Sequence, residues 1–184
     1  MSENLSHNHP DAASAWVERF AALVSPAGSV LDLACGRGRH VRLLAGMGHA
    51  VEAVDRDAQA LAGLSSLPGV TTRRADLENG PWPYAGRRFD GIVVSNYLHR
   101  PLFPHLVAAL AEGGVLIYET FMLGNERFGR PSNPEFLLRP DELLEAFGKP
   151  LRVVAFEQGE VALPKPAAVQ RLCAIKGEGP FRLP

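Results

Sequence analysis

Cysteine is scarce in this sequence of 184 residues, and its two cysteines do not form a recognisable pair. Cys35 and Cys173 lie far apart along the chain and belong neither to a CxxC motif nor to a cluster of cysteine and histidine residues. Disulfide frameworks and cysteine-based metal sites depend on such spacings. The sequence therefore predicts a reducing compartment and no metal site.

Long apolar runs and an excess of charge of one sign are also missing. No uncharged apolar stretch approaches the roughly 18 residues of a membrane helix, and Glu3 and His7 stand where a signal peptide would be apolar. The 19 Lys and Arg nearly balance the 20 Asp and Glu, so no overall field attracts the chain to nucleic acid or to an anionic membrane. Together these absences predict a cytoplasmic protein without membrane contact.

The composition is that of a globular protein, with 46% hydrophobic and 21% charged residues. At about 150 residues per domain, the length predicts a single domain over residues 1–184, in which 1–10 are expected to be flexible.

Short runs rich in Val, Ile and Leu alternate with amphipathic segments along most of the chain. The runs predict buried strands at 29–34, 50–54, 70–75, 89–95 and 114–120. The amphipathic segments predict helices at 11–24, 39–47, 57–64 and 104–111. This alternation indicates a doubly wound, Rossmann-like α/β fold with a parallel sheet.

The pattern changes after Gly124. A polar loop punctuated by Gly and Pro leads into a short helix expected at 140–147. Two further strand-like runs, 151–160 and 167–177, are separated by turn residues and predict an antiparallel hairpin that closes one edge. The expected sheet therefore has seven strands and is mostly parallel.

Polar residues interrupt the apolar runs where each predicted parallel strand ends. They recur every 19 to 24 residues, at Asp32, Asp55, Asp76, Ser95 and Glu119. The carboxyl ends of parallel strands meet at one edge of a sheet, where open α/β folds bind their ligands. The spacing therefore predicts a ligand cleft at this edge.

Glycines and carboxylates near this edge indicate a nucleoside. Gly36 and Gly38 permit a tight turn and a close approach of a ligand to the backbone. Asp55, which follows Gly36 by 19 residues, is placed to accept hydrogen bonds from two ribose hydroxyls. Asp76 could accept a hydrogen bond from the adenine amine, with the Leu77 amide facing a ring nitrogen.

Alternatives exist for both the residues and the ligand. Any one of these carboxylates could instead cap a helix or end a strand in solvent. NAD uses the same kind of site, but its GxGxxG/A fingerprint needs a small residue where this chain has Val41. An adenosyl ligand other than NAD is therefore favoured.

The segments VLDLACGRGRH, AVDRD, RRADLENG, FDGIVVS and GGVLIYETF together resemble the ordered motifs of class I S-adenosylmethionine-dependent methyltransferases. NYLHRPL, followed by YETF and GNERFGRPSNPEFLL, is similar to small bacterial methyltransferases of the tellurite-resistance type. The resemblance covers about residues 12–177 and implies S-adenosyl-L-methionine as the cofactor.

The resemblance also implies positions for the parts of that cofactor. The loop from Asp32 to Gly38, including Ala34 and Gly36, would hold the methionine part, Asp55 with the adjoining Arg56 the ribose, Asp76 and Leu77 the adenine, and Ser95 and Asn96 the floor beneath the sulfonium. The family usually has glycine at the position of Ala34. The methyl group of this alanine should narrow the approach to the cofactor without blocking it.

Methyl transfer from a sulfonium chiefly requires alignment in a dry site, and proximity and orientation can supply about 7–11 kcal/mol. A general base adds roughly 3–5 kcal/mol. His99 is the best candidate for a base, with Tyr97 and Arg100 beside it as further catalytic candidates. The alternative is that His99 caps the next helix while Arg100 is solvated or pairs with a carboxylate.

Several other side chains have two interpretations. Glu119 could face the acceptor or make an ordinary strand-end hydrogen bond. Arg127 and Arg130 could close over an anionic acceptor or simply solvate their loop. Trp16 is expected in the core beneath the first helix, and neither cysteine is expected to act as a nucleophile.

The predicted acceptor is a small molecule or small anion. The chain has no cysteine near the end of the fourth strand for C5-cytosine methylation, and Ser95-Asn96-Tyr97-Leu98 replaces the Asn/Asp-Pro-Pro-aromatic signature of amino-methyltransferases, so DNA is disfavoured. Two alternatives remain open, namely a non-catalytic module that binds the cofactor in support of a partner and an NAD-linked oxidoreductase. The pattern leaves the oligomeric state undetermined.

Overall fold

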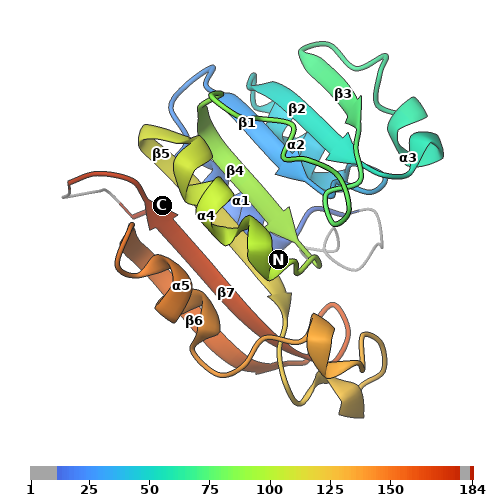
Figure 1. The fold of residues 1–184 in the computed structure, drawn as a ribbon, viewed down its shortest axis with the longest axis vertical. Coiled ribbons are helices and arrows are strands. Elements are labelled where there is room, and N and C mark those ends of the chain that lie inside the picture. The colour runs from blue at the N-terminus through green and yellow to red at the C-terminus, as the bar shows by residue number, and fades with distance from the viewer. Residues whose placement is uncertain (1–11, 179–182) are drawn as a thin grey trace, which may run out of the picture.

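Seven strands form one sheet in the computed structural model, which describes residues 12–178 and 183–184 (Figure 1). The strands lie in the order β3-β2-β1-β4-β5-β7-β6. Their bounds are β1 Ser29–Leu33, β2 Ala50–Asp55, β3 Val70–Arg74, β4 Phe89–Ser95, β5 Leu110–Phe121, β6 Arg152–Val161 and β7 Ala167–Ile175. The first five strands pair in parallel, whereas β7 is antiparallel to both β5 and β6. The predicted mostly parallel sheet with a C-terminal antiparallel hairpin is confirmed.

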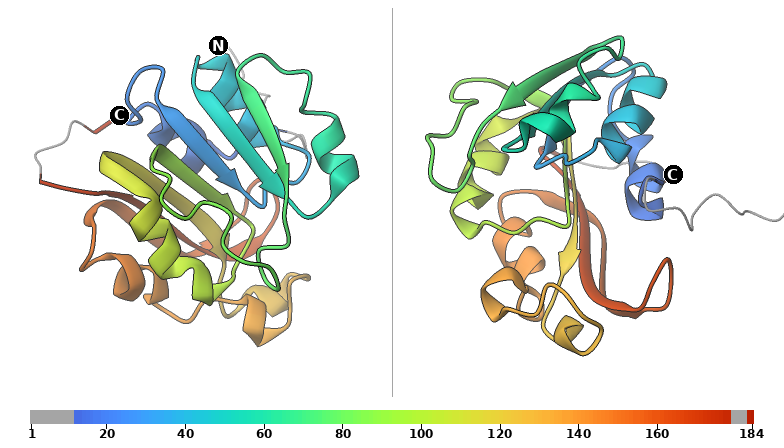
Figure 2. Two further views of the ribbon diagram at one scale, coloured as in Figure 1. Left: turned by 45° about the horizontal axis from the view of Figure 1, so that its top comes forward. Right: turned by 90° about the vertical axis from the view of Figure 1, so that its right-hand side faces the viewer.

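Helices cover both faces of this sheet (Figure 2). The α-helices are α1 Ala15–Ala21, α2 Arg39–Gly46, α3 Ala58–Ala62, α4 Phe103–Ala109 and α5 Glu142–Phe147, and short 3₁₀ turns occur at Arg100–Leu102, Asn125–Arg127 and Pro134–Phe136. Helices α1, α2 and α3 contribute to the core on one face of the sheet, and α4 and α5 contribute to the core on the other. The sheet is therefore buried on two sides, which explains the uninterrupted apolar runs of its strands.

Trp16 lies in the core as expected. Its side chain is 5% exposed, its ring packs edge-on against Phe20, and its Nε1–H donates to the Leu172 carbonyl at 3.4 Å. Helix α1 is thereby fixed against the sheet directly beside the carboxyl ends of the central strands.

Some element boundaries differ from the sequence prediction. The first helix begins at Ala15 because the Ser14 hydroxyl caps it by accepting from the Trp16 amide. The predicted start at Asp11 and the flexibility expected of 1–10 lie outside the described residues. The helix predicted at 104–111 ends earlier, because Leu110 already pairs with β4 as the start of β5.

The topology creates a crevice between β1 and β4. Strands β1, β2 and β3 run outward in one direction from this point, and β4 and β5 run outward in the other. Ligands of open α/β sheets bind outside the carboxyl ends of the strands at such a switch point. Within the described part of the chain, no helix has the length and apolar character required to cross a membrane.

Candidate functional site

Two adjoining hollows lie at the carboxyl ends of the central strands. The first hollow is lined by Ala34, Asp55, Arg56, Ala75, Asp76, Leu77, Glu78 and Tyr97. The second hollow is lined by Asp32, Ala34, Cys35, Gly36, Arg37, Gly38, Arg39, His40, Ser95 and Asn96. Their volumes are about 180 and 340 Å³, and small-molecule sites typically measure roughly 300–1,000 Å³. Because Ala34 lines both hollows, one ligand of ordinary size can extend through the two.

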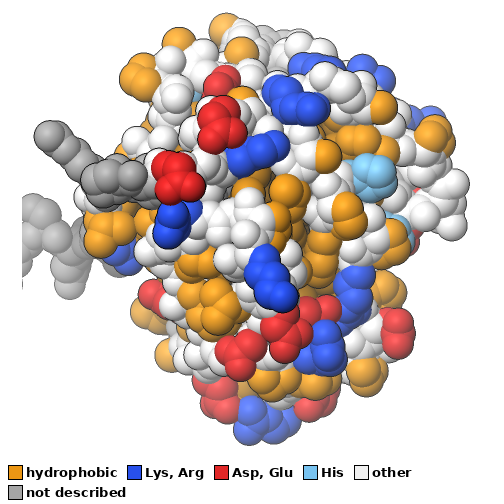
Figure 3. Space-filling model, turned by 60° about the vertical axis from the view of Figure 1, so that its left-hand side comes forward, with side chains coloured by type: hydrophobic (Ala, Val, Ile, Leu, Met, Phe, Trp, Pro, Cys, Tyr) orange, Lys and Arg blue, Asp and Glu red, His pale blue; other side chains and the backbone are white. Residues whose placement is uncertain are grey.

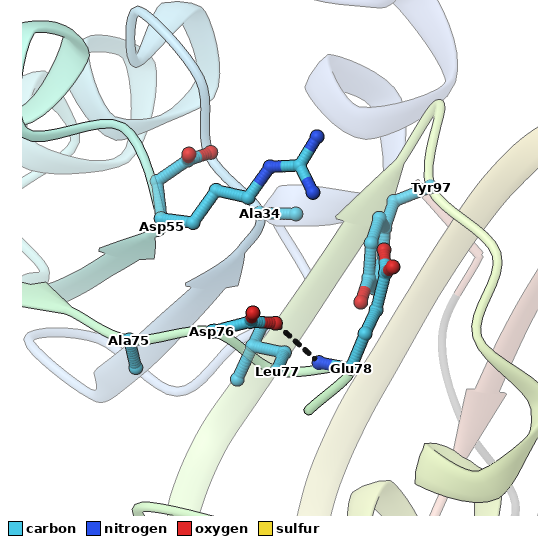
Figure 4. Close-up of a pocket in the computed structure, with 8 residues that line it drawn as sticks. Ala34, Asp55, Ala75, Asp76, Leu77, Glu78 and Tyr97 are labelled. Carbon is cyan, nitrogen blue, oxygen red and sulfur yellow. Dashed lines mark hydrogen bonds between the residues drawn. The ribbon is translucent and has the colours of Figure 1, made fainter. Parts of the chain in front are cut away.

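The structure brings together all the residues predicted to bind the cofactor, since each of them lines one of these hollows. The residues expected at the nucleoside gather in the first hollow, and those expected at the methionine part and beneath the sulfonium gather in the second. Figure 4 shows Asp55 and Asp76 at the ends of neighbouring strands, with the Tyr97 ring facing them across the first hollow.

Asp55 organises the glycine turn. Its Oδ2 accepts from the Gly36 amide at 2.8 Å, and its Oδ1 accepts from the Asp57 amide at 2.9 Å. Gly38 has φ +76°, and a Cβ at this position would meet a Leu64 methyl at 2.4 Å. A glycine is therefore required at Gly38 both by the left-handed backbone and by the close packing against the segment after α3.

Ala34 adopts a left-handed backbone conformation, with φ +52°. A residue with a side chain pays roughly 1–2 kcal/mol for this conformation, which is a physical reason for the glycine that the resemblance implies at this position. Asn96, with φ +55°, is also left-handed and is held by its amide, which donates to the Glu119 carbonyl at 2.9 Å. Both residues line the second hollow, whereas the other two described residues with a side chain and a left-handed backbone, Ala27 and Asp141, lie outside both hollows.

Asp32 is a buried carboxylate whose hydrogen bonding is incomplete. Its side chain is 1% exposed, and its Oδ2 has no hydrogen-bond partner among the described residues. Burial raises the pKa of Asp32 to about 7, and the charge of Arg39 and a hydrogen bond from the Val41 amide oppose this shift. Buried acceptors without partners are rare and costly, so an unpaired oxygen at a hollow indicates a cationic or hydrogen-bond-donating ligand group.

Asp76 is held in a fixed orientation by the turn that follows it. Its Oδ1 accepts from the Glu78 amide at 3.0 Å (Figure 4). The same Oδ1 accepts from the Asn79 amide at 3.1 Å, and its Oδ2 accepts from the Asn79 side-chain amide at 3.0 Å. The Asn79 side chain and these amides lower the pKa of Asp76. Asp76 therefore remains ionised at neutral pH and presents an acceptor next to the Leu77 amide.

Tyr97 lies in the first hollow, beside the residues expected at the adenine. Its hydroxyl is buried and has no hydrogen-bond partner among the described residues. Burial, together with the negative charges of Glu78 and Asp76, raises the pKa of Tyr97. The hydroxyl is therefore a neutral group at the first hollow, beside Asp76 and Glu78. The sequence pattern places Tyr97 beside His99 as a catalytic candidate and does not predict this position.

His99 lies outside both hollows. It occupies the capping position of the 3₁₀ turn Arg100–Leu102, but only its backbone carbonyl makes the capping contact, by accepting from the Leu102 amide. The half-buried imidazole makes no hydrogen bond within the described part of the chain. The His99 side chain therefore does not cap this turn, in contrast to the alternative considered from the sequence.

Arg100 is engaged entirely by the chain itself. Its Nε and Nη2 donate to the two oxygens of Glu142 at 2.6 and 3.0 Å. Its Nη1 and Nη2 also donate to the carbonyls of Glu135 and Leu137 at 2.8 and 2.9 Å. Its donors hold the segment before α5, and Arg100 lines neither hollow. The geometry therefore favours the prediction that Arg100 pairs with a carboxylate over the prediction that it acts in catalysis.

The other charged candidates also pair within the protein. Glu119 is buried and accepts from Arg171 Nε at 2.6 Å, which is the ordinary strand-end role. Arg127 donates to Glu160 at 2.6 Å and is thereby tied to β6. Arg130 is exposed, and neither loop arginine lines a hollow.

Two residues of the second hollow were missed by the sequence reasoning. Arg39 donates to the Ser95 hydroxyl at 3.0 Å, and His40 Nε2 accepts from the Ser14 amide at 3.1 Å. Burial and the neighbouring Arg39 lower the pKa of His40 to about 3, so the imidazole is neutral and suited to accept. Their position at the start of the helix that follows the glycine turn was the available signal.

Comparison with known proteins gives one family match and one curated relative. Residues 30–114 match the family described as a methyltransferase domain. Protein-L-isoaspartate O-methyltransferase from Chlorobaculum tepidum is 33% identical in an alignment of 111 positions that covers 55% of this chain and 49% of that protein. The chain thus spans about half the length of this curated relative.

Solved structures share the fold at low sequence identity. TehB from Haemophilus influenzae superposes with a TM-score of 0.74 and 20% identity, covering 90% of this chain and 63% of that one. A TehB-like S-adenosylmethionine-dependent methyltransferase from Corynebacterium glutamicum superposes with a TM-score of 0.64 and 20% identity, covering 89% of each chain. The family match supports the predicted resemblance to methyltransferases over residues 30–114, and the solved structures show that this chain shares the fold of these S-adenosylmethionine-dependent and TehB proteins.

Proposed function

We propose that this chain transfers a methyl group from S-adenosylmethionine to a small-molecule or small-anion acceptor. The observation that carries the proposal is the continuous cleft of two hollows that share Ala34. S-adenosylmethionine supplies a methyl group already activated by a positively charged sulfur. The residues present fit it, because the unpaired Asp32 oxygen suits an ammonium group and Asp55 and Asp76 suit the hydroxyls and amine of adenosine.

The protein's main contribution under this proposal is alignment. Asp55 and Asp76 are already fixed by backbone amides, so they do not have to reorganise when they accept hydrogen bonds from a ligand. Ser95 and Asn96 form the wall of the second hollow at the end of β4. Such preorganisation supplies proximity and orientation, which are worth on the order of 7–11 kcal/mol.

The charge distribution supports a small acceptor over a polyanion. Acidic and basic side chains are interspersed on the face shown in Figure 3, and the formal net charge of the chain is −1. Proteins that bind nucleic acid by its backbone present basic patches or stripes. We therefore expect the acceptor to enter the cleft as a small molecule and DNA not to be a substrate.

The proposal is tested by turnover. The protein is incubated with S-adenosylmethionine and a panel of small thiols, oxyanions and carboxylates, and release of S-adenosylhomocysteine is measured. Acceptor-dependent release supports the enzyme, whereas binding without turnover across the panel favours a non-catalytic module. An increase in melting temperature with NADH but not with S-adenosylmethionine would instead favour the NAD-linked alternative.

Asp55→Ala is expected to weaken binding of S-adenosylhomocysteine at least roughly tenfold. The variant loses a charged acceptor, whose hydrogen bonds are each worth about 1.5–3 kcal/mol, and it releases the Gly36 amide. Titration calorimetry measures the change. Asp57→Ala is the matched control, because it removes only the cap of α3 and should leave the affinity unaltered. Unchanged affinity in the Asp55 variant would show that Asp55 does not contribute to cofactor binding.

His99→Ala is expected to slow turnover by about 10²–10⁴-fold while leaving affinity for S-adenosylhomocysteine unchanged, which is the effect of losing a general base. The free imidazole, close in sequence to Ser95 and Asn96, makes His99 the candidate. His105→Ala serves as control, because this exposed side chain on α4 stacks on Trp82. A wild-type rate for the His99 variant would show that His99 is not the general base.

A further inference from the structure

The turn that follows β4 contributes to both hollows of the cleft. Asn96 lines the second hollow, and the next residue, Tyr97, lines the first. Asn96 has φ +55°, in the left-handed region that few residues with a side chain adopt. Because these adjacent residues line different hollows, the shape of the whole cleft depends on the conformation of this turn.

Strand β5 holds the turn through two hydrogen bonds. The Asn96 amide donates to the Glu119 carbonyl at 2.9 Å, and the Tyr97 carbonyl accepts from the Tyr118 hydroxyl at 2.9 Å. The first bond joins two backbone groups, whereas the second depends on the side chain at position 118. Most other side chains at this position would lack the donor, so Tyr118 makes a specific contribution to the turn.

The Tyr118 side chain is buried in the core on the α4 side of the sheet. It is 1% exposed, and its ring centroid lies 6.1 Å from that of Phe103 and 6.0 Å from that of Phe147. Phenylalanine would fill the same apolar space, so packing alone does not require the hydroxyl. A buried tyrosine hydroxyl needs a hydrogen-bond partner, and the partner here is a carbonyl of the turn that lines the cleft. Burial raises the pKa of Tyr118, which keeps the hydroxyl a neutral donor.

We propose that Tyr118 is a positioning residue that fixes this turn in the conformation that the cleft requires. It lines neither hollow and acts through Tyr97, whose carbonyl it holds. The inference rests on the proposed function and adds a residue of the sheet interior to the groups on which alignment of the methyl donor depends. Such support matters for proximity and orientation, because a misplacement of about 1 Å can cost about 10²-fold in rate.

Ligand binding tests the inference with Tyr118→Phe, which removes only the hydroxyl. Loss of a hydrogen bond that preorganises the site should weaken binding of S-adenosylhomocysteine about three- to tenfold, as measured by titration calorimetry. Tyr84→Phe is the matched control, because Tyr84 is also 1% exposed and its hydroxyl donates to Glu52 at 3.1 Å, away from both hollows. The control should lose a similar amount of stability but change the affinity less than about twofold.

Hydrogen exchange provides a second measurement that needs no ligand. Exchange in the ligand-free protein is followed by mass spectrometry on peptides that cover residues 95–100. We expect it to be at least about threefold faster in Tyr118→Phe than in the wild type, because the turn opens more readily, and to be unchanged in Tyr84→Phe.

Wild-type affinity in Tyr118→Phe, or unaltered exchange at 95–100, would overturn the inference and leave the proposed function intact. An equal loss of affinity in Tyr84→Phe would also overturn it, because the effect would then follow from general destabilisation. If the wild-type protein does not bind S-adenosylhomocysteine, the proposed function fails and the inference fails with it.

Discussion

Arg100→Ala is expected to lower the free energy of unfolding by roughly 2–4 kcal/mol. The Glu142 side chain is 6% exposed and would lose its bidentate partner, and the carbonyls of Glu135 and Leu137 would lose their donors. Removing one member of a buried ion pair typically costs about 3–5 kcal/mol, and the 36% exposure of Arg100 reduces that cost. For a domain of this size, the melting temperature should fall by roughly 4–16 °C, as measured by calorimetry.

The pH dependence of stability should change in the same variant. Burial acts to raise the pKa of Glu142, but the hydrogen bonds from Arg100 and the Arg139 amide outweigh it and lower the pKa below the ordinary 4.5. A lowered pKa in the folded state means that this stabilisation is present above pH 4.5 and is lost as the pH falls below it. The stability of Arg100→Ala should therefore change less than that of the wild type as the pH falls below 4.5.

Arg152→Ala is the matched control for this experiment. Arg152 pairs with Glu178, whose side chain is 94% exposed, and such surface pairs contribute about 0–1 kcal/mol. If Arg100→Ala kept wild-type stability but lost turnover, the structural interpretation would be wrong and the catalytic role expected from the sequence would return.

The cleft formed by the two hollows could be predicted from the sequence because its residues are placed by local rules. Each parallel strand must end at the same edge of the sheet, so the spacing of Asp32, Asp55, Asp76 and Ser95 is enough to bring them together. Glycine positions follow from the same reasoning, because a turn between strand and helix needs left-handed residues.

The roles of several charged residues could not be predicted, because they depend on contacts between distant segments. Glu119 ends a parallel strand as Asp55 does, but the antiparallel register of β7 places Arg171 directly opposite and pairs it. Arg100 follows β4 at the expected edge, yet α5 brings Glu142 to it from 42 residues away. Nothing in either local pattern indicates which partner the fold will supply.

Arg39 illustrates the opposite error, since a residue of the second hollow was passed over. Exposed basic residues are common near the starts of helices and usually remain in solvent, so the position of Arg39 after the glycine turn was a signal too weak to predict its contact with Ser95. The contact with Ser95 depends on the pairing of β1 with β4, which places the end of β4 beside the start of α2. Parallel pairing of distant strands is a tertiary property.

Asp32→Asn is expected to change stability and ligand affinity in opposite directions. Because burial raises the pKa of Asp32 to about 7, the folded protein holds a proton between about pH 4 and 7 that the unfolded chain has already released. Stability of the ligand-free protein therefore decreases as the pH rises through this range. The neutral asparagine removes this decrease and should stabilise the ligand-free protein at pH 8 by roughly 2–4 kcal/mol.

The same substitution should weaken binding of S-adenosylhomocysteine ten- to hundredfold, because the ligand ammonium loses a charged acceptor. Wild-type affinity should also increase with pH up to about 7, since binding favours the ionised carboxylate, whereas the variant's affinity should not follow this rise. Urea unfolding and calorimetry at pH 5 to 8 measure both effects.

Asp90→Asn provides the comparison, because Asp90 lies at the opposite end of β4 and its carboxylate already accepts from the amide and hydroxyl of Ser29 at 2.7 and 2.9 Å. This variant should gain no stability and should bind the ligand as the wild type does. If Asp32→Asn gains stability and Asp90→Asn does not, the Asp32 carboxylate is a buried charge that favours ligand binding but destabilises the folded protein. If Asp32→Asn were instead less stable at pH 8 and bound the ligand normally, the carboxylate would be a structural group, and the second hollow would lack the anion on which the recognition of an amino-acid ligand depends.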